Sequence, residues 1–123
     1  MIKVEFKAQE GYLHAIYDGD ITKDDLINYI DATRLNKEYP RKLKILTDST
    51  NANMLLSKSD LEAVIDANLK SLDQYEYIYD AILTANPKET ALSIWFKKMS
   101  ATNKYKFDVF STVESARKWL KEL

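Results

Sequence analysis

At the start of the chain, apolar side chains recur at every second residue, as in strands. Further along, segments with this strand period alternate with segments that have the helical period. Residues 2–8 alternate apolar and charged side chains, which is typical of a strand with one face in water. A second strand is predicted over residues 12–18, after a turn at Gly11, so we expect the two strands to pair as an antiparallel hairpin. Three further strands are predicted at residues 43–48, 77–85 and 106–110.

Each of the last four predicted strands is followed by a helical pattern that begins at a capping residue. These capping residues are Thr22, Ser57, Asn86 and Ser111. Gly19 is expected to end the second strand, and the polar residues 48–50 are expected to end the third strand in a turn. The interpretation therefore places short loops between strands and helices.

The resulting order, ββαβαβαβα, restricts the fold. Strand–helix–strand units with short links require parallel strands, because an antiparallel pair needs no crossover. The sequence thus predicts an α/β fold with a mixed five-stranded sheet. Strands two to five are parallel, strand one is antiparallel to strand two, and four helices cover the sheet.

Composition narrows the functional classes. The chain of 123 residues fits one domain, residues 1–123. With 18 basic and 19 acidic residues it carries a formal charge of -1, which disfavours a nucleic-acid partner. The absence of cysteine excludes disulfides and thiolate metal sites. No apolar run has membrane-spanning length and the first residues form a strand pattern rather than a signal peptide, so we expect a cytoplasmic protein.

Several local sequences, together with the element order, carry a family resemblance. They are Gly19-Asp20-Ile21-Thr22, Tyr39-Pro40, the strand that ends at Asp48, the cap at residues 57–60 and the closing segment 109–120. In these features the chain resembles the STAS family, and within it the group named after the stage II sporulation anti-sigma-factor antagonist. The resemblance implies a STAS-like fold in a protein that switches protein partners without catalysis.

The same resemblance points to the start of the helix after strand three. Members of the family often carry there a phosphorylated serine within the sequence Asp-Ser-Ser-Gly-Leu. This chain has Ser57-Lys58-Ser59-Asp60-Leu61, with Lys58 in the place of that serine. Ser57 and Ser59 are therefore the predicted phosphoacceptors. The alternative is that Ser57 is simply the N-cap of the helix, a role that serine commonly has.

Polar residues at the carboxyl ends of the predicted strands define a candidate face. In open α/β sheets ligands bind at this edge, so we expect a ligand or a protein partner there. The residues of this predicted face are Asp20, Asp48, Ser49, Ser57, Ser59 and Asn86. For Asp48 and Ser49 the alternative is that their side chains bond the amides of their own turn.

The sequence offers little for catalysis, metals or cofactors. His14 is the only histidine and is remote in sequence from any serine–acid pair, so no catalytic residue is assigned. The acidic residues between positions 18 and 25 match no calcium-loop spacing, so no metal site is predicted. With only Gly11 and Gly19 in the chain, a glycine-rich phosphate loop is excluded, and no cofactor is predicted.

These observations favour a non-catalytic regulatory or protein-binding module, switched at a helix N-terminus. An alternative is a carrier of a small apolar or lipid-like ligand, which fold-level analogy with lipid-transfer domains suggests. A carrier needs an apolar pocket between helices and sheet. The residues predicted to line it are Met54, Leu55, Leu56, Trp95 and Met99.

The least favoured hypothesis is a hydrolase. It requires His14 or a carboxylate within hydrogen-bond reach of Ser49 or Ser57. The oligomeric state stays open. A homodimer, if formed, is expected to use helices or aromatic patches, because the charged face of the first strand disfavours edge-to-edge pairing.

Overall fold

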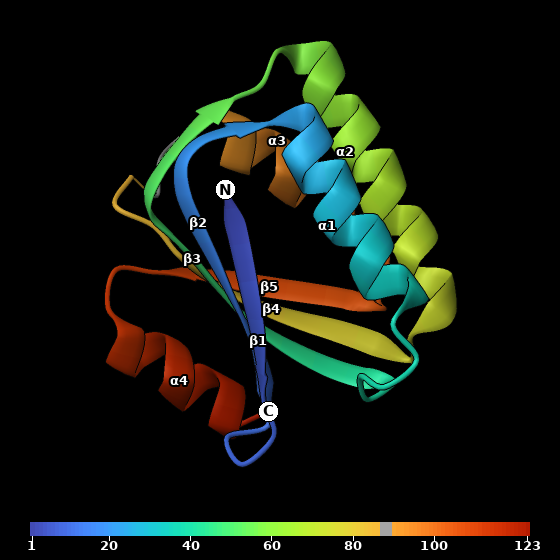
Figure 1. Cartoon of the computed structure of the whole chain (residues 1–123), viewed down its shortest axis with the longest axis vertical. Helices are drawn as coiled ribbons and strands as arrows, with labels where there is room; N and C mark the ends of the chain where they lie inside the picture. Colours follow the sequence, from blue (N-terminus) through green and yellow to red (C-terminus); the bar gives the residue numbers. More distant parts are fainter. Residues whose placement is uncertain (87–89) are drawn as a thin grey trace.

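The computed structural model describes residues 1–86 and 90–123 and contains a five-stranded sheet (Figure 1). The spatial order of the strands equals their sequence order. β1 is antiparallel to β2, and the pairs from β2 to β5 are parallel, which confirms the predicted mixed sheet. The strands are β1 (Ile2–Lys7), β2 (Tyr12–Thr22), β3 (Lys42–Leu55), β4 (Tyr77–Leu83) and β5 (Tyr105–Phe110).

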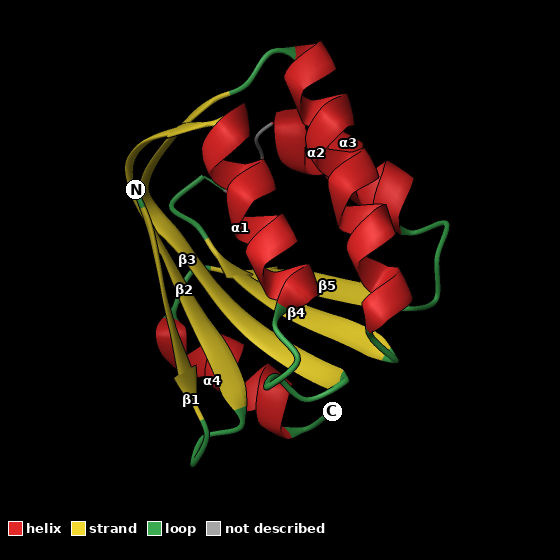
Figure 2. Ribbon diagram, turned by 45° about the vertical axis from the view of Figure 1, so that its right-hand side comes forward, coloured by secondary structure: helices red, strands yellow, loops and turns green. Residues whose placement is uncertain are grey.

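Helices cover both faces of the sheet. They are α1 (Lys23–Leu35), α2 (Lys58–Ser71) with the 3₁₀ turn η1 (Leu72–Gln74), α3 (Thr90–Met99) and α4 (Val113–Lys121). Figure 2 shows α1, α2 and α3 on one side of the sheet and α4 alone on the other. Each helix connects two parallel strands or follows the last one, as the short links in the sequence require.

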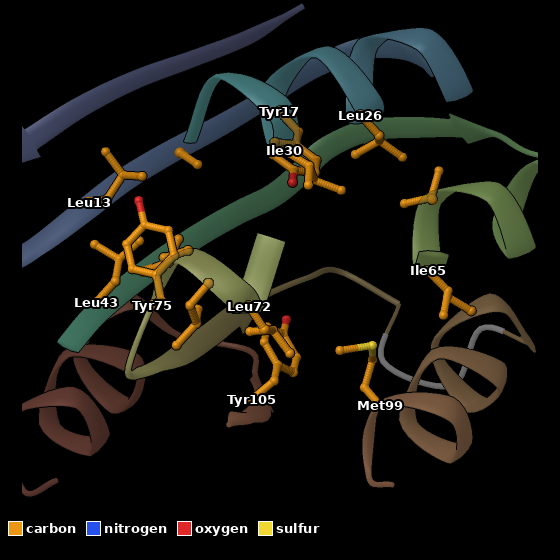
Figure 3. Packing of buried hydrophobic residues seen from close by; sticks show 14 of the residues in the cluster. Leu13, Tyr17, Leu26, Ile30, Leu43, Ile65, Leu72, Tyr75, Met99 and Tyr105 are labelled. Carbon is orange, nitrogen blue, oxygen red and sulfur yellow. The ribbon is translucent and has the colours of Figure 1, made fainter. Parts of the chain in front are cut away.

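The sheet separates two apolar clusters. The larger cluster lies between the sheet and α1–α3 and includes Leu13 and Leu43, which are fully buried (Figure 3). The smaller cluster lies under α4, where Ala116 and Leu120 pack on Leu46. Neighbouring strand residues point to opposite faces, so each inner strand supplies both clusters.

Two strands are longer than predicted. β2 continues through Gly19 to Thr22, and β3 continues through the expected turn to Leu55. Residues 18–22 and 51–55, which include most of these extensions, pair with each other in parallel and form what we call the β2–β3 ribbon. The predicted strand ends were wrong because this pairing satisfies the backbone groups that a turn would otherwise satisfy. A register shift after Ile16 and the positive φ of Gly19 (74°) let the ribbon leave the sheet.

Thr22 and Ser57 are the N-caps of α1 and α2 as predicted, whereas the predicted cap of the last helix is wrong by one residue. The N-cap of α4 is Thr112 rather than Ser111, because the Thr112 hydroxyl accepts a hydrogen bond from the Ser115 amide at 3.2 Å. On α2, Leu69 is exposed and the neighbouring Asn68 is buried. The predicted helix start at residues 87–89 lies outside the described residues.

Candidate functional site

A cavity of about 140 Å³ lies between the sheet and helices α1–α3. Aliphatic and aromatic side chains form most of its wall. Of the five residues predicted to line such a pocket, Met54, Leu56 and Trp95 do so. Leu55 is exposed instead, and Met99 is buried in the core without lining the cavity. Met54 belongs to the β2–β3 ribbon, so the longer strands help to enclose this space.

Among the described residues, one carboxyl group lines the cavity, that of Asp80 in β4. Its Oδ1 accepts a hydrogen bond from the Thr47 hydroxyl, and its Oδ2 accepts one from the Tyr105 hydroxyl, each at 2.7 Å. Asp80 keeps some accessible surface because it faces the cavity, while protein surrounds it on the other sides. Burial raises the pKa of the Asp80 carboxyl to about 6, and the two hydrogen bonds oppose this shift.

In the described part of the chain, four aromatic side chains share the cavity wall with Asp80. Tyr17 and Tyr29 form one edge-to-face pair, and Trp95 and Tyr105 form another, each with ring centroids 6.0 Å apart. Tyr17 and Tyr105 appear in Figure 3 among the buried residues of this layer. Burial, reinforced by the charge of Asp80, raises the pKa of the Tyr17 and Tyr105 hydroxyls, so both stay neutral.

The indole N–H of Trp95 is buried. It makes no hydrogen bond of good geometry with the described residues, although it lies near enough to the Tyr105 oxygen to stabilise its charged form. Buried polar groups normally have partners, so this donor is unusual in a folded core.

Of the six residues of the predicted face, Ser49 lines the cavity. Its hydroxyl donates to the carbonyl oxygen of Leu83 at 2.9 Å, which links β3 to the end of β4. Asp48, the preceding residue, points to the opposite face of the sheet. Its Oδ1 accepts from the amide of Thr50 at 3.1 Å, so the alternative of local backbone bonding is confirmed for Asp48.

Ser57 and Ser59 lie exposed at the start of α2. Ser57 is the N-cap: its hydroxyl accepts from the amide of Asp60, whose carboxylate in turn accepts from the amide of Ser57, both at 3.1 Å. The hydroxyls of Ser57 and Ser59 are 3.1 Å apart and hydrogen-bonded. The capping alternative is thus confirmed, and phosphorylation of either serine stays a prediction.

The two remaining residues of the predicted face are exposed. Asp20 lies in the β2–β3 ribbon, where its carboxylate accepts from the Asn53 side chain at 3.0 Å. Asn86 follows β4, and its backbone amide donates to the Thr84 hydroxyl at 3.2 Å. A binding role for Asp20 and Asn86 stays a prediction.

The arrangement required for a hydrolase is not present in the described part of the chain. His14 lies beside Tyr12, with ring centroids 6.3 Å apart, and partial burial lowers the pKa of its imidazole. The hydroxyls of Ser49 and Ser57 bond to backbone groups and to Ser59 rather than to His14 or a carboxylate.

Residues 1–86 and 90–123 contain neither a cluster of metal ligands nor a membrane-spanning helix. No group of three or more His, Cys, Asp or Glu side chains there could hold a metal ion. No helix in that part of the chain is long and apolar enough to cross a membrane.

Asp80 and its two partners were missed by sequence reasoning. A signal was available: Asp80 lies two residues from both Ile78 and Ile82, so a strand predicted to be apolar carries an acid on its inward face. Thr47 and Tyr105 lie on the strands at either side of β4, and no local pattern marks them as partners of that acid.

Comparison with known proteins supports the fold. No protein-family model and no curated protein sequence matches the chain. Among solved structures, it is similar to an uncharacterized protein from the DUF3478 family with a SpoIIAA-like fold from Shewanella loihica PV-4. The TM-score is 0.62 at 20% sequence identity, over 98% of this chain and 92% of that chain. The chain therefore has a SpoIIAA-like fold, as the resemblance to the STAS family predicted.

Proposed function

We propose that this protein is a non-catalytic binding module that holds a small apolar ligand between its sheet and helices α1–α3. The observation that supports this proposal is the cavity of about 140 Å³ with Asp80 in its wall. Protein interiors contain few voids larger than a water molecule, so a space of this size is not a normal packing defect. An engineered apolar cavity of about 150 Å³ in another protein binds benzene, which sets the scale of the ligand.

The proposal can be tested with toluene and a matched pair of variants. Leu56→Trp places a larger side chain in the cavity wall, whereas Leu55→Trp makes the same change at the neighbouring exposed position. We expect toluene to shift NMR signals of cavity residues in the wild-type protein and in Leu55→Trp. The shifts should be lost in Leu56→Trp.

Two results of this titration would contradict the proposal. One is the absence of any shift in the wild-type protein at saturating toluene. The other is an equal response of the two variants, since a surface effect of toluene does not depend on the cavity wall. Circular dichroism of both variants checks that they are folded.

A second candidate is a regulatory module that binds a protein partner and is switched at the start of α2. The observation that favours it is the exposed, hydrogen-bonded pair Ser57 and Ser59, which directly follows the cavity residue Leu56. A phosphate on either serine would lie at a helix N-terminus, where negative charge is favourable.

Native mass spectrometry of the protein from its own cells distinguishes the two candidates. A retained small molecule supports the ligand carrier. A phosphate-sized mass that maps to Ser57 or Ser59 supports the switched module. A chain with neither addition contradicts both a stable ligand and stable phosphorylation under those conditions.

A further inference from the structure

The cavity wall combines an acid, aromatic rings and no base among its described residues. The acid is Asp80, and the rings belong to Tyr17, Tyr29, Trp95 and Tyr105. None of the described lining residues is a lysine, arginine or histidine. A carboxylate removed from water without a cation is costly, because its lost hydration is not replaced.

The two hydrogen bonds to Asp80 replace only part of that hydration. An ionised carboxylate has about four acceptor positions. Thr47 and Tyr105 occupy one position on each oxygen, so about two remain. Asp80 also lines the cavity, so a bound molecule can reach the carboxyl group from that side.

The aromatic rings of the cavity wall also favour a positively charged ligand. The face of a tyrosine or tryptophan ring carries negative potential and attracts an organic cation. Tyr17 and Tyr29 come from β2 and α1, while Trp95 and Tyr105 come from α3 and β5, so the rings reach the cavity from both its sheet and its helix side. An anionic ligand would be repelled by the carboxylate and would not gain this attraction to aromatic rings.

We propose that the cavity selects a compact apolar amine, whose protonated nitrogen donates hydrogen bonds to Asp80 and whose apolar body, about the size of a benzene ring, contacts the aromatic wall. This inference rests on the proposed function and adds the chemical class of the ligand. An ammonium group supplies both the missing positive charge and the donors for the free acceptor positions. A hydroxyl group supplies a donor without the charge, and a carboxylate supplies neither.

Three probes that share one ring test this selectivity: benzylamine, benzyl alcohol and benzoate. We expect dissociation constants, measured by NMR titration near pH 7.5, to place benzylamine first by about 10- to 100-fold over benzyl alcohol. Benzoate should bind most weakly. Asp80→Asn should remove the preference for the amine and leave the affinity for benzyl alcohol within about threefold.

Asp108→Asn is the matched control. Asp108 is exposed on β5, opposite Ala81 in the register, and its carboxylate accepts only from its own following amide, Val109, among the described residues. This variant removes the same charge from the surface, so the preference for benzylamine should persist. An equal loss in Asp80→Asn and Asp108→Asn would show a general charge effect and overturn the inference.

The wild-type protein gives a second reading that does not depend on whether Asp80→Asn folds. The ratio of benzylamine to benzyl alcohol affinity should fall as the pH is lowered through 6, because the Asp80 carboxyl becomes neutral there. The other ionisable groups among the described wall residues, Tyr17, Tyr29 and Tyr105, have raised pKa values and stay neutral throughout.

The outcomes separate the two proposals. If benzyl alcohol binds as tightly as benzylamine, or if the ratio is independent of pH, the amine selectivity is wrong and the cavity still binds small apolar molecules. If neither toluene nor any of the three probes binds, the proposed function fails together with the inference.

Discussion

At the residue scale, Asp80 is expected to make stability depend on pH in an unusual direction. Its pKa is about 6 in the folded protein against 3.8 for an ordinary aspartate, so the folded state holds the proton more tightly. The favourable contribution is complete below the unfolded pKa and decreases as the pH rises through the window from 4 to 6. The size of the loss is roughly 3 kcal/mol.

Asp80→Asn should remove this pH dependence. We expect the difference in unfolding free energy, variant minus wild type, to become more positive between pH 4 and pH 7, as measured by urea unfolding. Asp108→Asn should show no such trend, because that carboxylate is exposed. Parallel curves for the wild-type protein and Asp80→Asn over this range would contradict the burial of the charge.

Ser49 and Asp80 show which site residues can be predicted from the sequence and which cannot. Ser49 was selected because it ends the predicted third strand, and it does line the cavity. Asp80 was not selected, because its importance arises from Thr47 and Tyr105 on neighbouring strands. Such contacts depend on the register between strands, which a local pattern does not contain.

At the element scale, capping sequences were the most reliable signals. Thr22 and Ser57 cap α1 and α2 as predicted, and each forms a capping box, which needs only residues within one turn. The predicted ends of β2 and β3 were wrong because they depend on contacts between distant segments. The β2–β3 ribbon exists only because two segments about 33 residues apart pair, as Asp20 and Asn53 do. This pairing outweighs the turn propensity of residues 48–50, so the chain continues there as a strand.

The α2 cap leads to a specific expectation for two neighbouring serines. Ser57→Ala removes the acceptor for the Asp60 amide and should lower the unfolding free energy by about 1 kcal/mol. Ser59→Ala should change it by less than about 0.5 kcal/mol, because the Ser59 hydroxyl is exposed and bonds only to Ser57 among the described residues. Chemical denaturation of both variants measures the difference.

Equal losses in the two serine variants would contradict the assigned N-cap. A loss confined to Ser59→Ala would do so as well. The comparison also separates a structural role of Ser57 from any signalling role, since stability is measured without a partner.

At the scale of the whole molecule, the order of elements along the chain and the direction of strand pairing follow from the pattern of the sequence. The order ββαβαβαβα, with short links, restricts β2–β5 to parallel pairing, and the structure confirms this. The cavity could not be predicted in the same way. Residues Met54, Leu56 and Trp95 were recognised as candidates, but whether facing side chains fill the space between them is decided by packing in three dimensions.

The length of β3 has a consequence for how its amide hydrogens exchange with solvent. Residues 45–48 pair with both β2 and β4, whereas residues 51–55 pair with β2 alone in the β2–β3 ribbon. Amides of the first part should exchange only through global unfolding, and those of the ribbon through local opening, with protection lower by at least about tenfold.

Since Met54 of the ribbon and Thr47 of the first part both line the cavity, a bound ligand should slow exchange in both parts, because it stabilises the folded state against global unfolding and because local opening of the ribbon disrupts the cavity wall. Uniform protection along β3, measured by NMR in heavy water, would contradict this division. If the two parts do differ, β3 contains both the most slowly exchanging amides of the protein and, in the ribbon, amides whose exchange rate depends on whether the cavity is occupied.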